Sequence, residues 1–425
     1  MKALNLICIY LFSTLFVSTF ACSSMGQKHQ QTIIEKNERK TKEELKEYKI
    51  LPIKPKTKYV LSEDWDLKGE TYILPDSIIL ASKGGVFKNG TLIGDNSQIE
   101  TATPLFNKVK IKGEWIVPNI TTRLFTDLDY RNSLQDVLAL ANPTVSNSIL
   151  IEEGNYFVSA EAFKPALSVC SNVKLFINGN IHLEANDYKG SYVLNIKDAH
   201  NVSVSGRGCI YGDKDSHKGE IGEWGHGINV ISSKDVSIHD FTIRNCWGDC
   251  IYIGLSSKNI EIRNCVLDHG RRQGISVTSA DGVLIENSII SNVSGTNPQA
   301  AIDIEPNHYE TVDNVIIRNV NCVNCEGGIE TWRPKDARLG SVTIDGCSIS
   351  GSSKRWPIIV RFAEIASIVN CTVYADSRTA IAVAKSDNVK ILKNQVYTTS
   401  STPIKVSKCT RSSVKNNAIK TAIKK

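Results

Sequence analysis

The segments D-V-S-I-H-D (235–240), N-I-E-I-R-N (259–264), G-V-L-I-E-N (282–287) and N-V-I-I-R-N (314–319) repeat one pattern. Each ends in an aspartate or asparagine that follows a short apolar run. The corresponding end positions along the chain are Asp240, Asn264, Asn287, Asn319, Gly346, Asn370, Asn394 and Asn417, separated by 24, 23, 32, 27, 24, 24 and 23 residues. A recurring step of this length, lengthened twice by insertions, indicates stacked similar units.

The content of each repeat indicates which unit is stacked. Each repeat holds about three short β-type runs and no helical run of useful length. Such short runs cannot bury a face alone, but coils laid on one another bury a continuous interior. Asparagine tolerates the left-handed conformation of a tight corner, and stacked amides can donate and accept along the column. The pattern therefore predicts an all-β chain that forms a right-handed parallel β-helix.

Composition narrows the classes of function. The chain has 425 residues, of which 41% are hydrophobic, so a large core is possible. The segment 385–425 holds ten Lys or Arg against the single acidic Asp387, while the whole chain carries +6. A nucleic-acid groove would spread its basic residues along the binding face. We therefore expect a charged, edge-protecting terminus and no nucleic-acid partner.

Twelve cysteines raise the question of disulfides and metals. Cys347 and Cys371 fall at the same place in neighbouring repeats, where cysteine serves as a small buried apolar residue. Adjacent strands are close enough for such a pair to form a disulfide, so that alternative stays open. Cys322-x-x-Cys325 has no partner pair at zinc spacing, and we predict no metal site.

The first 22 residues have the pattern of an export signal. A lysine and a largely apolar run lead to Thr19-Phe20-Ala21-Cys22, which is similar to the bacterial lipobox, and polar residues follow at once. We predict a signal peptide over 1–22, lipidation of Cys22 and a charged tether over 23–50. The protein would then be exported and lipid-anchored to a membrane of the bacterial cell envelope. A plain signal peptide or an uncleaved anchor helix is the alternative.

Residues 51–125 read as short strands with Gly and Asn or Asp turns, which fits either an N-terminal β region or the first coils. The next segment has a helical pattern that places Leu134, Val137 and Leu138 on one face. A short helix at the start of a β-helix would cover the open end of its core. We predict that the β-helix domain, with this capping helix, occupies 126–425.

One strand of each repeat carries an isoleucine at a fixed place. These isoleucines are Ile228, Ile251, Ile275, Ile302, Ile329, Ile358 and Ile381. Side chains alternate along a strand, so the residues one and three places later should face outward. The first outward column reads Asn229, Tyr252, Ser276, Asp303, Glu330 and Ile359, and the second reads Ile231, Gly254, Thr278, Glu305, Trp332 and Arg361. The residue before each isoleucine is mostly small, which we expect to leave a trough beside the columns.

Carboxylates, guanidinium groups and tryptophans gather on this strip. Carboxylates do acid and base work, and tryptophan offers an apolar face to sugar rings, so the combination indicates a polysaccharide site. We assign catalysis to Asp303, Glu305 and Asp249. Substrate binding is assigned to Arg271, Arg272, Gln273, Glu330, Trp332, His226, Trp247 and Arg361. The alternative is a row of solvated Arg–carboxylate pairs.

Strand geometry sets the expected separations of the acidic groups. Asp303 and Glu330 should lie about 5 Å apart, Asp303 and Glu305 about 7 Å, and Asp249 and Asp303 about 10 Å. Retaining glycosidases hold their two carboxyls about 5 Å apart and inverting ones about 6.5 to 9.5 Å apart. Crowded carboxylates raise one another's pKa, which would place an acid beside a base.

At these residues the sequence resembles the pectin-lyase-like β-helix superfamily, and most of all glycoside hydrolase family 28, the polygalacturonases. The resemblance starts near Asp129 and runs to the end of the chain. The similar motifs are Asp129-Tyr130-Arg131-Asn132-Ser133-Leu134-Gln135, Gly154-Asn155-Tyr156, Trp247-Gly248-Asp249-Cys250-Ile251, Arg272-Gln273-Gly274-Ile275-Ser276 and Asp303-Ile304-Glu305. The resemblance implies a right-handed β-helix that acts on a polysaccharide.

The same comparison shows departures at the family's functional positions. Asp249 alone matches one of its three catalytic aspartates. The places of its other two aspartates, its histidine, its arginine and its lysine hold His226, Gly248, Gln273, Asp303 and Glu305. The resemblance therefore implies the fold without the polygalacturonase mechanism, and the loss of the basic pair argues against a galacturonate at that subsite.

Three functions fit the sequence. The first is a glycoside hydrolase, exported and surface-tethered, that needs no cofactor. The second is a polysaccharide lyase or uronate epimerase, in which Arg271, Arg272 or a Ca²⁺ ion held by Asp303, Glu305 and Glu330 neutralises the uronate and Arg361 or His226 acts as base. The third is a non-catalytic glycan-binding protein.

Overall fold

The computed structural model describes residues 48–128, 133–352 and 354–421. The predicted leader, Cys22 and most of the tether lie outside these residues, as do 129–132 at the start of the family resemblance. From Lys49 onward the chain forms one compact unit. No helix among the described residues is long and apolar enough to cross a membrane.

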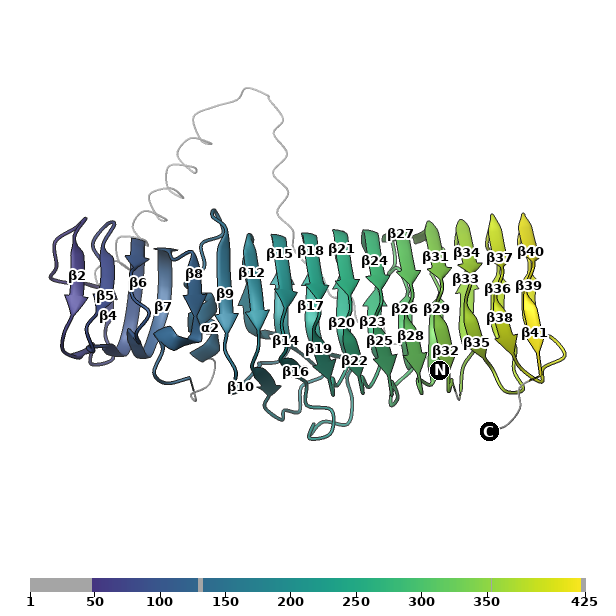
Figure 1. The fold of residues 1–425 in the computed structure, drawn as a ribbon, viewed down its shortest axis with the longest axis horizontal. Coiled ribbons are helices and arrows are strands. Elements are labelled where there is room, and N and C mark those ends of the chain that lie inside the picture. Colours follow the sequence, from purple (N-terminus) through teal and green to yellow (C-terminus); the bar gives the residue numbers. More distant parts are fainter. Residues whose placement is uncertain (1–47, 129–132, 353, 422–425) are drawn as a thin grey trace, which may run out of the picture. The chain divides into compact units, whose positions relative to one another are not determined.

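Three parallel sheets run side by side along most of this unit (Figure 1). The ten-stranded sheet contains β11 (Pro165–Val169), β14 (Gly190–Lys197), β17 (Trp224–Ile231), β20 (Asp249–Gly254), β23 (Gln273–Val277), β26 (Ala300–Ile304), β29 (Gly327–Thr331), β33 (Ile358–Arg361), β36 (Ile381–Ala384) and β39 (Ile404–Ser407). The eleven-stranded sheet contains β10 (Asn155–Val158), β13 (Asn180–Leu183), β16 (Cys209–Tyr211), β19 (Thr242–Arg244), β22 (Val266–Asp268), β25 (Ile289–Ser291), β28 (Asn321–Val323), β32 (Ser348–Ser350), β35 (Thr372–Tyr374), β38 (Gln395–Tyr397) and β41 (Ala418–Lys420).

The third of these sheets has thirteen strands. It contains β8 (Asn119–Thr121), β9 (Asn147–Ile151), β12 (Val173–Ile177), β15 (His200–Ser205), β18 (Lys234–His239), β21 (Ser257–Arg263), β24 (Ala280–Glu286), β27 (Thr311–Arg318), β31 (Ser341–Asp345), β34 (Ile365–Val369), β37 (Val389–Leu392) and β40 (Ser412–Lys415), with β30 (Arg338–Leu339) beside β27. Each coil contributes one strand to each sheet, so the predicted parallel β-helix is confirmed.

The N-terminal part of the unit is also built from parallel strands. A separate seven-stranded sheet contains β1 (Lys49–Ile50), β2 (Lys58–Leu61), β3 (Trp65–Asp66), β4 (Thr71–Ile73), β5 (Ile79–Ser82), β6 (Phe87–Ile99) and β7 (Phe106–Ile116). A 3₁₀ turn (Thr122–Leu124) follows, and a backbone bond from Leu105 N to Leu124 O joins it to this sheet.

The predicted short helix is confirmed as α2 (Ser133–Leu138). Leu134, Val137 and Leu138 are buried on one of its faces. The helix contacts both β7 of the seven-stranded sheet and β11 of the ten-stranded sheet. It therefore covers the N-terminal end of the three-sheet core, and the seven-stranded sheet continues beyond it.

The isoleucine column behaves as the repeat predicts. Residue-for-residue pairing runs through Ile228, Ile251, Ile275, Ile302, Ile329, Ile358 and Ile381. All seven are fully buried, because alternation along each strand turns them toward the interior. This pairing sets the register of the outward columns and brings Asp303 beside Glu330.

The small residues before the isoleucines have a different reason from the one the sequence suggested. A Cβ added at Gly274 would lie 2.3 Å from Ile290 Cγ2 and 2.5 Å from Ala301 O, which is inside the core. At Gly227 it would lie 2.6 Å from Ile243 Cγ2. Close packing against the eleven-stranded sheet therefore excludes a side chain at Gly227 and Gly274, and the expected outer trough is wrong as an explanation.

The Asp and Asn residues at the ends of the repeats form the predicted stack, which we call the asparagine column. It is confirmed in most coils and is displaced by one residue in the last two. Asn264 Nδ2 donates to Asp240 Oδ1 at 2.9 Å, and both residues have positive φ. In the final coils the left-handed residues are instead Lys393 and Asn416. Asn394 and Asn417 stand one place later, where the Oδ1 of Asn394 accepts from the N–H of Cys371 at 2.9 Å.

In the described chain every cysteine from Cys170 to Cys409 is free. Cys347 and Cys371 stack in neighbouring coils as buried thiols, so the open disulfide alternative is not the state seen here. Their position beside the asparagine column matches the predicted role as small buried residues.

Candidate functional site

A pocket of about 400 Å³ opens on the outer face of the ten-stranded sheet. Its walls are Arg272, Asn297, Pro298, Asp303, Glu305, Glu330, Trp332, Arg355 and Arg361. We call it the carboxylate pocket. Six of these residues belong to the predicted site, so the repeat pattern brings together side chains that lie on or directly beside β23, β26, β29 and β33, as expected.

Asp303 is the most constrained acid in the carboxylate pocket. It is only 3% exposed, and Gln273 Nε2 donates a hydrogen bond to its Oδ2. Burial raises the pKa of Asp303 well above its ordinary value, and the negative charges of Glu330 and Glu305 raise it further. Asp303 therefore holds its proton more tightly than an ordinary aspartate and suits the role of a general acid.

Glu305 lies directly after β26 and is more accessible than Asp303. The negative charge of Glu305 is one cause of the raised pKa of Asp303. Both side chains line the carboxylate pocket. An acid that holds its proton tightly therefore has a second, more accessible carboxyl in the same pocket.

Glu330 is the third acid and is held by two arginines. Arg355 Nη2 lies 3.0 Å from Glu330 Oε2, and Arg361 Nη2 lies 3.9 Å from the same atom. Burial raises the pKa of Glu330, while Arg355 and Arg361 oppose that rise. Glu330 therefore acts mainly as an anchor that keeps two positive side chains at the pocket.

Trp332 forms an apolar wall of the carboxylate pocket. It follows β29 directly and remains 38% exposed, although large aromatic side chains are usually highly buried. Its ring is thus available to a ligand, as the sequence predicts for a residue that stacks on a sugar.

Asp249 and His226 were predicted at the surface of the site but lie beneath it. Asp249 is fully buried and accepts from Ser276 Oγ at 2.8 Å. His226 is 2% exposed, and its Nδ1 accepts from the backbone N–H of Asp249 at 3.3 Å. Burial raises the pKa of Asp249 to about 6 and lowers the pKa of His226 to about 3. Neither residue lines the carboxylate pocket, so both can act on a ligand only through the side chains above them.

A hydrogen-bond network connects this buried layer to the pocket. Arg272 lies 3.3 Å from Asp249 Oδ2 and also donates to Gln273 Oε1. With its carbonyl oxygen occupied by Arg272, the Gln273 amide points its N–H toward Asp303. Gln273 was predicted to bind substrate, but it is fully buried and instead fixes Asp303.

Arg271 and Trp247, also predicted to bind substrate, form a separate cluster. Arg271 Cζ lies 3.7 Å from the centroid of the Trp247 ring, and the ring of His217 stacks on Trp247 at 3.8 Å. Because the Arg271 guanidinium and the His217 ring both approach the Trp247 ring this closely, they lie on opposite faces of it. Arg271 also donates to Gly222 O at 2.7 Å. These contacts are internal, and neither residue lines the carboxylate pocket.

Sequence reasoning missed three residues of the pocket. Arg355 comes from the loop between β32 and β33, where no repeat position identifies it. Asn297 and Pro298 come from the insertion before β26. That insertion interrupts the repeat, which is the one sequence signal that pointed to extra structure at this place.

No group of three His, Cys, Asp or Glu side chains in the described residues is arranged to hold a metal ion. Asp303, Glu305 and Glu330 are the set that the sequence offered for Ca²⁺. In the structure Glu330 is engaged by arginines instead. The Ca²⁺ alternative stays a prediction.

The β-helix fold is also identified by a match to a protein-family model. The family model described as "Right handed beta helix region" matches residues 145–305, 226–331 and 297–423. The chain belongs to this right-handed β-helix family. Apart from β8, the strands of the three long sheets lie within the matched residues, so handedness and architecture agree with the sequence prediction.

Two curated relatives of this β-helix protein come from Bacillus subtilis strain 168. The SPbeta prophage-derived uncharacterized protein YorA is 31% identical over 162 residues, which are 33% of this chain and 28% of YorA. The uncharacterized protein YclG is 27% identical over 225 residues, which are 45% of this chain and 38% of YclG. The matches thus span well under half of either relative.

Among solved structures, the A-module of the mannuronan C-5 epimerase AlgE6 from Azotobacter vinelandii is similar with a TM-score of 0.55. The alignment covers 69% of this chain and 84% of the module at 16% identity. Similarity at that identity supports the β-helix fold and says nothing of activity.

Proposed function

We propose that this β-helix protein is a polysaccharide-degrading glycoside hydrolase that uses Asp303 as general acid and Glu305 as the second carboxyl. The observation that carries the proposal is the buried Asp303, whose pKa is raised by burial and by neighbouring glutamates, in the same pocket as the more accessible Glu305. Trp332 supplies an apolar wall for a sugar ring in the same pocket.

The chemistry follows from these positions. Asp303 donates its proton to the glycosidic oxygen, which takes the electron pair of the breaking bond to the anomeric carbon. Glu305 accepts a proton from the water whose oxygen forms the new bond to that carbon. The products are a free hydroxyl on the leaving sugar and a new reducing end, and no cofactor is required.

A uronate lyase or epimerase acting at the same pocket is the second candidate. Arg355 and Arg361 face the pocket beside Glu330 and could neutralise the carboxylate of a uronate ring. The resemblance to polygalacturonases and the Ca²⁺ alternative both concern this second candidate, because each bears on whether the substrate carries a uronate carboxylate. A non-catalytic glycan-binding protein is the third candidate.

Export and attachment through a lipidated Cys22 remain part of the proposal. The sequence pattern of the first 22 residues supports them, and this segment lies outside the described residues. Metabolic labelling with a radioactive fatty acid, compared between wild type and Cys22→Ala, tests the anchor. Label in both proteins would contradict it.

One assay separates the three functions. The protein without residues 1–48 is incubated with neutral and uronate-containing polysaccharides, and reducing ends and the ultraviolet absorbance of unsaturated uronate are followed. Reducing ends alone support hydrolysis, both signals together indicate a lyase, and altered uronate composition without cleavage indicates an epimerase. Binding without any of these products would establish the glycan-binding alternative.

A further inference from the structure

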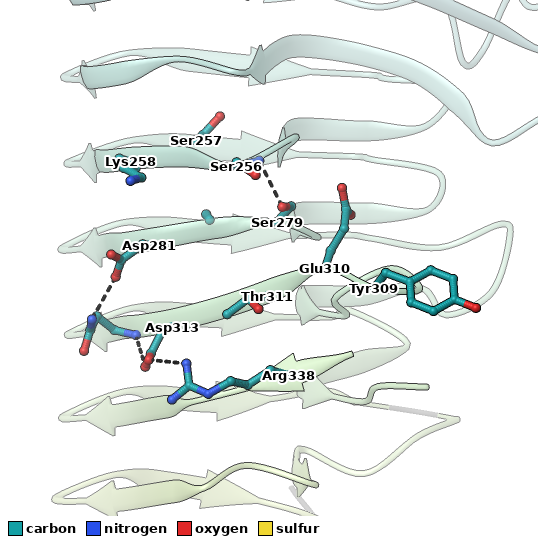
Figure 2. Close-up of a pocket in the computed structure, with 12 residues that line it drawn as sticks. Ser256, Ser257, Lys258, Ser279, Asp281, Tyr309, Glu310, Thr311, Asp313 and Arg338 are labelled. Atoms are coloured by element: carbon teal, nitrogen blue, oxygen red, sulfur yellow. Dashed lines mark hydrogen bonds and ion pairs between the residues drawn. The ribbon is translucent and has the colours of Figure 1, made fainter. Parts of the chain in front are cut away.

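A second cavity of about 400 Å³ lies beside the first residues of β21, β24 and β27, on the thirteen-stranded sheet. Its walls include Lys258, Ser279, Asp281, Tyr309, Glu310 and Arg338. We call it the Tyr309 groove. Figure 2 shows Tyr309 and Glu310 toward one end of it and Lys258 and Asp281 toward the other.

The charged side chains that line the Tyr309 groove are Lys258, Asp281, Glu310, Asp313 and Arg338. Arg338 donates to Asp313 at 2.7 Å and to Glu364 at 2.9 Å. Asp281 accepts from Asn314 Nδ2 at 2.8 Å and keeps further lone pairs free for donors. With Arg338 engaged by two carboxylates, the positive charge of Lys258 faces the two carboxylates of Asp281 and Glu310. The lining side chains carry more negative than positive charge, so the groove suits hydroxyl donors better than anions.

Tyr309 is unusually placed for an aromatic residue. It is 86% exposed, and its φ of 64° lies in the left-handed region that bulky side chains rarely adopt. Neighbouring bonds hold the loop in this form. The N–H of Asn307 donates to Thr278 O at 3.2 Å, and His308 pairs with Asp336 at 2.9 Å. The fold thus maintains an exposed aromatic ring, and such rings stack on sugars.

The same loop connects the Tyr309 groove to the carboxylate pocket. Glu305 borders the pocket and Tyr309 borders the groove, and the four residue steps between them span at most about 14 Å. The His308–Asp336 pair also ties this loop to the segment that follows Trp332. One short stretch of polymer could therefore contact Trp332 and Tyr309 together.

We propose that the Tyr309 groove is an additional subsite that binds an uncharged sugar unit of the same polysaccharide on which the carboxylate pocket acts. The ring of Tyr309 stacks on the sugar, and Asp281 and Glu310 accept hydrogen bonds from its hydroxyls. The inference rests on the proposed function, because it supplies a second contact to that enzyme's polymeric substrate.

Affinity electrophoresis tests the subsite. Gels contain soluble starch, galactan, xylan, polygalacturonate or alginate, and the Asp303→Asn parent keeps the polymer intact. In the gel that retards this parent, adding Tyr309→Ala or the isosteric Asp281→Asn should weaken the apparent Kd about three- to tenfold. Tyr374→Ala, at a tyrosine 43% exposed on β35, serves as the matched control and should match the parent.

Turnover of Tyr309→Ala in the otherwise wild-type chain separates the two proposals. A raised KM for the polymer together with weakened retardation supports both. Cleavage with unchanged KM and retardation overturns the subsite alone. Tyr309-dependent retardation without product overturns the enzyme and keeps the subsite, whereas no retardation and no product overturn both. Dependence on Tyr309 only in polygalacturonate or alginate gels overturns the assignment to an uncharged sugar.

Discussion

Asp303 and Glu330 are direct partners on the adjacent strands β26 and β29, and they are only 3% and 4% exposed. Two carboxyls so close and so poorly hydrated cannot both ionise easily. Arg355 and Arg361 favour the ionised form of Glu330, whereas burial and both neighbouring glutamates favour the protonated form of Asp303. Asp303 is therefore the member of the pair that keeps a proton for transfer.

Replacing this proton donor should stop the reaction. Asp303→Asn keeps the shape of the side chain and removes its acidity, so kcat should fall by about 10²- to 10⁴-fold while KM changes little. Initial rates of reducing-end formation measure the effect. Asp198→Asn, at an exposed carboxylate away from the pocket, is the control. A variant rate within twofold of wild type would remove Asp303 from the mechanism.

Gln273 should tune the acid without touching the substrate. Its Nε2 donates to Asp303 Oδ2, and a donor of this kind favours the ionised carboxylate. Gln273→Leu should therefore raise the pKa of Asp303 further and move the alkaline limb of the kcat profile to higher pH. Gln395→Leu on β38 is the surface control. A loss of kcat with an unmoved limb would reduce Gln273 to a packing role.

The repeat pattern predicted the part of the site that depends on register. Because the isoleucines stack once per coil, the positions of Asp303, Glu305, Glu330, Trp332 and Arg361 relative to one another follow from strand geometry. The one-residue displacement of Asn394 from the left-handed corner position could not be predicted from the repeat, because asparagine can stand at either of two adjacent corner positions.

The buried polar layer beneath the pocket could not be predicted from alternation. Each of Asp249, His226 and Gln273 stands two places before a column isoleucine, so strict alternation would turn it toward the interior. The structure instead bonds Asp249 to Ser276 of the outward column, and neighbouring rings cover this layer, as Tyr192 and Tyr252 cover His226. Arg355 could not be predicted as a pocket residue for a related reason, because it lies in a loop that has no fixed position in the repeat.

The isoleucine column should carry much of the stability of the coils. Ile302 is fully buried, so Ile302→Ala should lower the free energy of unfolding by about 3 kcal/mol through lost burial and the cavity left behind. Ile365→Ala, at a side chain 48% exposed, should change it by less than about 0.5 kcal/mol. Urea denaturation followed by circular dichroism measures both. Equal costs at the two positions would contradict the stacked interior.

His226 should make the protein sensitive to acid. Burial, aided by the positive charge of Arg272, lowers its pKa to about 3, whereas an unfolded histidine titrates near 6.5. Between these values the unfolded chain binds a proton that the folded chain does not. His226 therefore costs about 1.4 kcal/mol of stability for each pH unit lost in that window. Asp249 acts in the opposite direction between about pH 4 and 6, because burial raises its pKa to about 6 and the folded chain keeps that proton.

His226→Phe separates the two opposing contributions. The phenyl ring preserves the stack between Tyr192 and Tyr252 but leaves the N–H of Asp249 without its acceptor, which should lower stability at pH 7 by about 1 to 3 kcal/mol. As the pH falls from 6 to 4.5, the variant should lose less stability than wild type, by about 1.4 kcal/mol per unit. Tyr192→Phe keeps the histidine and should follow the wild-type slope. Urea titrations at four pH values measure these slopes, and parallel lines for wild type and His226→Phe would mean that the folded chain protonates His226 as readily as the unfolded one.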